Sequence, residues 1–352
     1  MELLNNHIID CLKQKQSFAI VTIMTHKGST PRTSGSKMIV LKDRTIFGTI
    51  GGGLVEALTI DACIDMIKKN QCQIKEFALN QKLKDGLDMV CGGDLTVFID
   101  TFAKISDDLI SELDSIFNKI IALEKKGKKG FLVSKISGFS KSEFTCKKSL
   151  ILPDGTITGQ GLIPKPLIEA IQNNQFSGSF PILYNHNLEE YIIEPVQPRD
   201  TLYIFGAGHV GFQLAKVAHI TDFQVVVVDD RDEFSNRQRF PDAKDVIVVD
   251  NFKNAYNNLK IDDHSYIVIL TRGHLYDQVV LEAALKTNAA YIGMIGSRGK
   301  REQIYSNLRE KGILENTLKT IYSPIGIEIN SETPGEIAIS IIAQIIQFRA
   351  TK

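Results

Sequence analysis

The sequence predicts an α/β protein in which an α+β N-terminal domain precedes a C-terminal Rossmann-like, doubly wound parallel sheet. The chain has 352 residues, and a single hydrophobic core usually stops growing below that length. Two prolines lie among polar residues in the segment 194–200, directly before an apolar run, which is typical of a domain boundary. From residue 202 onwards, short apolar runs alternate with helical patterns, as they do in parallel sheets. We therefore expect an N-terminal accessory domain at 1–195 and a nucleotide-binding domain at 199–352.

Composition and charge exclude several classes of protein. Lys plus Arg equals Asp plus Glu, 41 each, so no overall positive field attracts nucleic acid or an anionic membrane. The apolar runs are too short to span a bilayer, and the start of the chain has no charged segment followed by an apolar one. These features predict a cytoplasmic protein without nucleic-acid or membrane partners.

The five cysteines are scattered, and none forms a C-x-x-C pair. This pattern predicts reduced thiols and argues against a disulfide framework and a structural zinc site. Cys11, Cys63 and Cys72 lie in or beside apolar helical runs, where cysteine fills space. Cys91 differs because it precedes Gly92-Gly93 at the entry to a strand, where a thiol can approach a ligand. We take Cys91 as the candidate catalytic residue, with an inert buried cysteine as the alternative.

The N-terminal domain contains two similar hairpin patterns, because Ile151–Gly159 resembles Val40–Gly48. The match predicts a partial internal duplication, although one this short also arises by chance. Periodicity predicts helices at 1–14, 54–68, 106–126 and 165–172, and strands at 17–25, 38–41, 45–50, 74–79, 95–99, 131–136, 144–152, 181–184 and 189–193.

Two segments of this domain have the composition of anion sites. Gly51, Gly52 and Gly53 lie between a strand and a helix, where consecutive backbone N–H groups can hold a phosphate. The alternative is close helix–sheet packing, for which one glycine usually suffices. The loop 26–36, which includes Arg32, is rich in glycine, hydroxyls and cations and can surround an oxyanion. A solvated loop has the same composition.

The C-terminal domain begins with a dinucleotide-binding pattern. An apolar run enters a G-x-G-x-x-G turn made by Gly206, Gly208 and Gly211, and a helical pattern and a second apolar run follow. The first glycine permits a tight turn, the second lets the backbone approach a pyrophosphate, and the third allows close helix–strand packing. Asp229 ends the second run, where a carboxylate binds ribose hydroxyls. The alternative is a glycine turn without a ligand.

Polar residues follow the other apolar runs, and ligands bind at the carboxyl ends of strands in such sheets. His209 and His274 each follow a glycine there, and each is a candidate ligand or proton donor or, alternatively, a local hydrogen-bonding group. Arg272 and Ser297 add a cation and a hydroxyl at the same edge. Strands are expected at 202–205, 224–229, 245–249, 266–271 and 290–295, and helices at 300–310 and 337–348, the last apolar on nearly every side and therefore buried in a core or an interface.

Together these motifs resemble the XdhC/CoxI family of xanthine dehydrogenase accessory factors over nearly the whole chain. The motifs that carry the resemblance are Gly28-Ser29-Thr30-Pro31-Arg32, Gly48-Thr49-Ile50-Gly51-Gly52-Gly53-Leu54-Val55-Glu56-Ala57, Cys91-Gly92-Gly93, Phe205–Gly211, Val228–Arg231, Thr271–His274, Ile295–Arg298 and Glu332-Thr333-Pro334. Many relatives carry a Thr-His-Asp type run where this chain has Thr271–His274, so the ligand of the second domain differs between branches.

The resemblance implies a cytoplasmic, dimeric maturation factor that binds molybdenum cofactor and delivers it in sulfurated form to a molybdenum hydroxylase. A cysteine desulfurase is a further implied partner. The glycine triplet and Glu56 suit the molybdopterin phosphate, and Cys91 suits contact with molybdenum or sulfur. Two alternatives remain: an NAD(P)-dependent oxidoreductase with His209 or His274 as proton donor, and a nucleotide-sensing regulator without catalysis.

Overall fold

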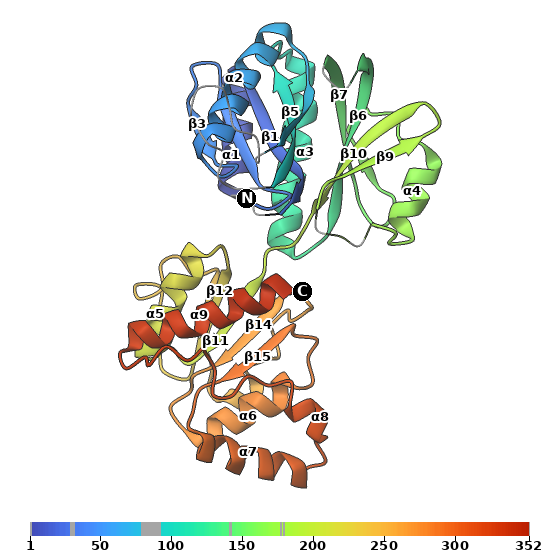
Figure 1. The fold of residues 1–352 in the computed structure, drawn as a ribbon. Coiled ribbons are helices and arrows are strands. Elements are labelled where there is room, and N and C mark those ends of the chain that lie inside the picture. Colours follow the sequence, from blue (N-terminus) through green and yellow to red (C-terminus); the bar gives the residue numbers. More distant parts are fainter. Residues whose placement is uncertain are drawn as a thin grey trace. The chain divides into compact units, whose positions relative to one another are not determined.

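The computed structural model describes residues 2–28, 32–78, 93–140, 143–176, 178 and 180–351. The chain forms two compact units, Met1–Pro198 and Arg199–Lys352 (Figure 1). Each unit has its own sheets and hydrophobic cores. Among the described residues, no helix combines the length and the apolar character that crossing a bilayer requires.

The first unit begins with an antiparallel five-stranded sheet in the order β3-β2-β1-β5-β4. Its elements are α1 (Glu2–Lys13), β1 (Phe18–Lys27), β2 (Lys37–Leu41), β3 (Ile46–Gly48), α2 (Gly53–Lys69), β4 (Gln73–Ala78) and β5 (Asp94–Phe102). We call these elements the first repeat.

A second antiparallel sheet follows in the order β8-β7-β6-β10-β9, which reproduces the connectivity of the first. Its elements are α3 (Asp107–Lys126), β6 (Gly130–Ser140), β7 (Glu143–Ile151), β8 (Ile157–Thr158), α4 (Lys165–Gln172), β9 (Ile182–His186) and β10 (Glu189–Val196), and we call them the second repeat. The two hairpins match in detail, because Asp43 and Asp154 each accept a hydrogen bond from the threonine N–H two residues on, at 3.0 and 2.9 Å. The duplication inferred from the hairpins therefore extends over every helix and strand of the unit.

Among the ion pairs that cross from one repeat to the other, two are largely buried. The strand registers make Lys37 of β2 equivalent to Lys148 of β7, and Asp100 of β5 equivalent to Glu194 of β10. Lys37 pairs with Glu194, and Lys148 lies 2.7 Å from Asp100. Each lysine thus binds the carboxylate of the other repeat, and the pairs are related by a pseudo-twofold arrangement.

The sheets of the first unit are covered on both faces, because the central strands β1, β5 and β10 contain consecutive buried side chains. Helices α1 and α3 contribute to one core, which includes Ile8, Ile20, Ile120 and Leu132 and joins the two repeats. The outer faces pack separately against α2 and against α4. Apolar residues at helical spacing account for this burial.

The second unit is a five-stranded, fully parallel sheet in the order β13-β12-β11-β14-β15. Its elements are β11 (Thr201–Phe205), α5 (His209–Ile220), β12 (Gln224–Asp229), β13 (Asp245–Val248), the 3₁₀ helix η1 (Phe252–Asn254), β14 (Ser265–Ile269), α6 (His274–Ala284), β15 (Tyr291–Met294), α7 (Arg298–Glu310), α8 (Glu315–Leu318) and α9 (Pro334–Thr351). This order and the helices on both faces confirm the predicted Rossmann-like sheet after an α+β unit.

Helices α5 and α9 cover one face of the parallel sheet, and α6 and α7 cover the other (Figure 1). Helix α9 starts with a capping box, in which the Glu336 carboxylate accepts from the Thr333 N–H at 3.0 Å. Its apolar surface is only partly covered: Ile341 and Ile345 are buried, whereas Ile339 is 52% exposed. The expected burial in a core is confirmed on one side, and burial of the other side in an interface stays a prediction.

Candidate functional site

The three glycines of the β11–α5 loop differ in their surroundings. A Cβ on Gly206, at φ +122°, would lie 2.3 Å from the Leu270 carbonyl oxygen, and a Cβ on Gly211 would lie 2.0 Å from the Gly206 oxygen. A Cβ on Gly208 would have no heavy atom within 4 Å. Gly206 and Gly211 are thus required by packing. Gly208 leaves open space at the N-terminus of α5, where a phosphate is stabilised by backbone N–H groups.

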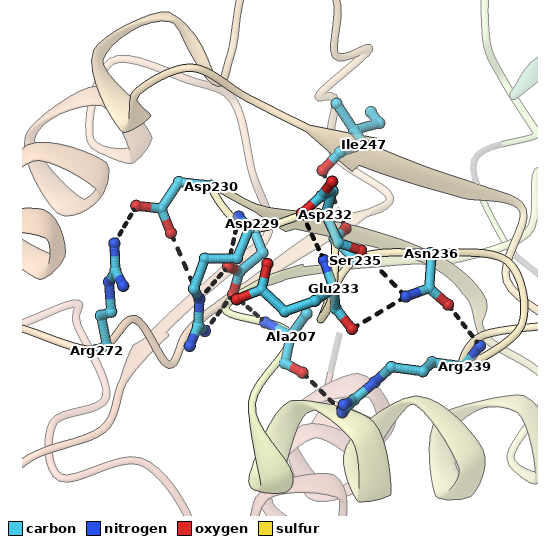
Figure 2. Close-up of polar contacts among 11 residues, drawn as sticks. Ala207, Asp229, Asp230, Asp232, Glu233, Ser235, Asn236, Arg239, Ile247 and Arg272 are labelled. Carbon is cyan, nitrogen blue, oxygen red and sulfur yellow. Dashed lines mark hydrogen bonds and ion pairs between the residues drawn. The ribbon is translucent and has the colours of Figure 1, made fainter.

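Asp229 holds this loop in place. Its side chain is buried and accepts a hydrogen bond from the Ala207 N–H at 2.7 Å (Figure 2). It also accepts a hydrogen bond from Arg231 Nε at 2.8 Å. Burial raises the pKa of Asp229, but the bonds from Arg231 and Ala207 outweigh it and hold the pKa below its ordinary value. Because both carboxylate oxygens already bind protein groups, Asp229 acts first as a support for the glycine loop.

A charged rim lies beside Asp229 at the carboxyl edge of the sheet. Arg272, which follows β14, reaches Asp230 after β12 with Nη2 2.8 Å from the carboxylate, and half of the Arg272 side chain is exposed (Figure 2). Arg231 lies 3.7 Å from the same carboxylate and stacks on the Phe234 ring at 4.0 Å. Asp230 and Arg272 are therefore the groups that a ligand at this edge would meet.

Arg239 supports the glycine loop from another direction, and the sequence did not indicate it. Its Nη2 donates to the Ala207 carbonyl oxygen at 3.2 Å (Figure 2). Its guanidinium lies about 5 Å from the rings of Phe212 and Phe234. No regular pattern marks the loop that carries Arg239, so only the folded chain reveals this contact.

A buried carboxylate of α6 contacts the segment that follows β14. Asp277 is fully buried, accepts from the Thr271 hydroxyl at 2.5 Å and forms an ion pair with Lys300 of α7. Burial raises the pKa of Asp277 in spite of these partners. A carboxyl group with a raised pKa beside a lysine at a sheet edge is a candidate for proton handling. Asp277 lies within a helical pattern, so sequence reasoning missed it, and the Lys300 partner with it.

The remaining predicted site residues at this edge are Ser297, His209 and His274. Ser297 caps α7, because its hydroxyl accepts from the Lys300 N–H at 3.3 Å. His209 is exposed in the first turn of α5. His274 is the first residue of α6, and its side chain lies outside the described residues.

The glycine triplet of the first unit has a backbone conformation that other residues rarely adopt. Gly51, Gly52 and Gly53 have φ values of +124°, +75° and +62°. A Cβ on Gly52 or Gly53 would have no heavy atom within 4 Å. Gly52 and Gly53 are therefore not explained by tight packing. They leave open backbone at the start of the 17-residue helix α2.

Glu56 already fills part of this cradle. Its Oε2 accepts from the Ile50 N–H at 3.1 Å, the Gly52 N–H at 3.2 Å and the Thr49 hydroxyl at 2.5 Å. The carboxylate stands where the backbone geometry favours an anion. An incoming phosphate must therefore displace Glu56 or bind beside it.

Two predicted residues cannot be placed against this cradle. Cys91 falls within residues 79–92, which lie outside the described chain. Arg32 is exposed and follows residues 29–31, which also lie outside it.

These observations define a class of protein: an α+β unit with a glycine-lined helix start, followed by a Rossmann unit with a nucleotide-type loop. Residues 202–345 match the model described as the XdhC Rossmann domain, and residues 11–78 match the model described as the XdhC and CoxI family. The chain belongs to the XdhC/CoxI family.

Similar proteins support this placement. The chain is 24% identical to the uncharacterized protein YqeB of Escherichia coli K12, over 96% of its own length but only 44% of that protein. It is 25% identical to a protein of Bacillus subtilis described as a probable xanthine dehydrogenase subunit, covering 97% of this chain and 96% of that one. It is 20% identical to the molybdenum cofactor insertion chaperone PaoD of Escherichia coli K12, covering 97% and 86%. A crystal structure described as a xanthine dehydrogenase from Bacillus halodurans matches with a TM-score of 0.77 and 26% identity, covering 99% of this chain and 96% of that one.

Proposed function

We propose that this protein is a maturation factor that binds molybdenum cofactor and assists its sulfuration and insertion into a xanthine dehydrogenase-type molybdenum hydroxylase. Family membership supports an accessory role. The names of the Bacillus subtilis and PaoD relatives point to the same system, and both matches extend over 97% of this chain. We therefore assign a part in this function to both units of the protein.

The glycine triplet is the observation that carries the binding part of the proposal. Molybdopterin has a phosphate, and Gly52 and Gly53 leave open space at a helix N-terminus, where a phosphate is stabilised. Glu56 would then regulate access, because its carboxylate shares the same N–H donors. A soft thiolate suits molybdenum and sulfur, and we assign that contact to Cys91.

The second unit would bind a nucleotide at the Gly208 end of α5. The nucleotide is either the tail of a dinucleotide form of the cofactor or NAD(P). The client is the molybdenum hydroxylase, and a cysteine desulfurase would supply the sulfur. We further propose that the protein acts in the cytoplasm as a homodimer.

Pterin content and client activation test the proposal together. Full-length protein is produced in cells that make molybdenum cofactor, and bound pterin is measured by fluorescence after oxidation. Activation of cofactor-free client is then assayed with the same samples. Wild type should carry pterin and activate the client, and Cys91→Ala should keep the pterin but lose activation. Wild-type protein that binds no pterin and does not change client activity would refute the proposal.

A matched pair of glycine variants tests the cradle. Gly53→Ala places a side chain at a left-handed position in the cradle, whereas Gly312→Ala places one at φ +87° in the second unit, where a Cβ also has no heavy atom within 4 Å. Both substitutions carry a similar backbone strain of about 1–3 kcal/mol. Only Gly53→Ala should lower pterin content, and equal loss in both would indicate a general effect of destabilisation.

The open space at Gly208 also favours the second candidate, an NAD(P)-dependent oxidoreductase. Hydride transfer would change the absorbance of the nicotinamide when a substrate is supplied. A cofactor carrier gives no such change by itself.

A further inference from the structure

Two cysteines that are far apart in the sequence lie together in the first unit with a carboxylate. Cys72 directly precedes β4 and pairs with Phe144 across the junction of the two repeats, and Cys146 follows two residues later on β7. One ligand atom from each of Cys72, Cys146 and Asp100 lies within 4.8 Å of the other two. The separation of 74 residues between the cysteines explains why no metal-binding pattern is visible in the sequence.

The spacing of these three atoms suits a thiophilic divalent cation. Zinc binds thiolate sulfur at about 2.3 Å and carboxylate oxygen at about 2.0–2.2 Å, which places tetrahedral ligands about 3.5 Å apart. Cys72 Sγ already lies 3.3 Å from Asp100 Oδ1, where the thiol donates its hydrogen. A metal ion would replace this hydrogen, and the distances between the ligand atoms would need to shorten by about 1 Å at most.

Lys148 orients the carboxylate and balances the charge. Its Nζ lies 2.7 Å from Asp100 Oδ2 and 2.8 Å from the Ser134 hydroxyl, so Oδ1 is the oxygen that faces Cys72. Two thiolates and one carboxylate carry three negative charges, which one divalent cation and one ammonium group neutralise. A buried charge is stable only when it is paired, so this arrangement can exist inside the unit. Lys148 would act as the outer partner that holds a metal ligand in orientation.

An opening lies next to the three groups. A cavity of about 190 Å³ is lined by Cys72, Cys146 and Asp100, and also by the half-buried Glu112 and the exposed Gln160. It offers an ion a way in and leaves room for a water molecule. Three protein ligands with an open fourth position are typical of zinc sites at which a ligand exchanges.

We propose that Cys72, Cys146 and Asp100 bind a zinc-type divalent cation with an exchangeable fourth ligand. This site is separate from the glycine cradle and from the nucleotide loop. Its test needs neither pterin nor a client enzyme, so it can fail while the proposed function stands.

Cobalt titration of the reduced, full-length protein tests the site. Co²⁺ bound by thiolates gives a sulfur-to-metal charge-transfer band and intense visible bands, which other ligands do not reproduce. The background is a Cys91→Ser variant, so that this thiol does not contribute. One equivalent of Co²⁺ should give these bands, and Zn²⁺ should remove them by competition.

Cysteine variants on the same background locate the ligands. Cys72→Ser and Cys146→Ser should each weaken Co²⁺ binding by at least about 100-fold, since loss of an outer partner alone costs about 10–100-fold. Cys63→Ala is the matched control, because Cys63 is a buried thiol of α2 outside the cluster, and it should bind Co²⁺ as the background does. Circular dichroism without metal checks that each variant is folded. Absence of thiolate bands in the background protein, or unchanged bands in folded Cys146→Ser, would overturn the proposal.

Discussion

Breaking the crossed ion pair between Lys37 and Glu194 should strongly destabilise the first unit. Glu194 is 4% exposed, its Oε2 binds both Lys37 and the Thr22 hydroxyl, and the Lys37 side chain is 17% exposed. Removing one partner of a buried pair leaves an uncompensated charge and costs about 3–5 kcal/mol. Lys148 lies close enough to affect the pKa of Glu194 and would compensate part of the loss. We therefore expect Lys37→Met to lower the free energy of unfolding by about 3 kcal/mol.

The double variant Lys37→Met/Glu194→Met separates the attraction between the two charges from the cost of burying them. Replacing both partners by apolar side chains removes the orphaned charge, so the double variant should be more stable than Lys37→Met alone. The coupling energy from the double-mutant cycle should be at least about 2 kcal/mol, within the range measured for residues in direct contact. Lys15→Met is the control, because Lys15 pairs with Asp107 at 2.7 Å with both side chains more than half exposed. Such a pair contributes less than about 1 kcal/mol.

Urea unfolding of the full chain, followed by circular dichroism, gives the free energies. Hydrogen exchange in peptides from β2 and β10 assigns the transition to the first unit, since the chain contains no tryptophan to report on it. Additive effects of Lys37→Met and Glu194→Met, with a coupling energy below about 0.5 kcal/mol, would show that the two residues do not stabilise each other.

Three further predictions follow from the same contacts. Gly208→Ala should change the free energy of unfolding by less than about 0.5 kcal/mol but weaken nucleotide binding, measured by NADH fluorescence. Gly211→Ala should destabilise the protein by about 1–3 kcal/mol, because its methyl group would lie 2.0 Å from an oxygen. If neither variant binds NADH more weakly, Gly208 is not part of the nucleotide site. Burial raises the pKa of Glu194, but the Lys37 and Lys148 charges outweigh it and hold the pKa below its ordinary 4.5, so the stability that Glu194 contributes is complete above pH 4.5 and is lost as the pH falls through the lower pKa of the folded state. In urea unfolding at several pH values, the free energy of unfolding should therefore fall less steeply with acid in Glu194→Gln than in wild type. The same pH dependence in both proteins would contradict this. Burial raises the pKa of Asp277 above 3.8, so the folded unit binds the carboxyl proton more tightly than the unfolded chain does. The free energy of unfolding should therefore decrease as the pH rises from 3.8 through the raised pKa. Asp277→Asn should remove this pH dependence, and a wild-type pH dependence in the variant would refute the assignment.

Much of the fold could be predicted from the sequence, because local periodicity determines it. The five parallel strands, helix α5 and the capping box at Thr333 all follow from short-range patterns. The hairpins at Asp43 and Asp154 revealed the duplication for the same reason, since an identical turn leaves an identical sequence signal.

The contacts that define the candidate sites were harder to predict, because they join distant segments. Asp229 was expected to meet a ribose, yet it binds the Ala207 N–H and Arg231. Glu56 was expected to accompany a phosphate, yet its carboxylate already binds the N–H groups of the cradle. The crossed pairs of Lys37 and Lys148 depend on how one repeat packs on the other. No local pattern encodes that packing.

The two repeats start their central helices differently. Helix α2 follows Gly52, whereas α4 follows Pro164, which has no N–H to offer an anion. The second repeat therefore has the same framework without a glycine at the helix start. Replacing residues 162–164 by three glycines would test whether such a helix start is sufficient to bind a phosphate. The helix start at Gly51–Gly53 in the first repeat would serve as the comparison.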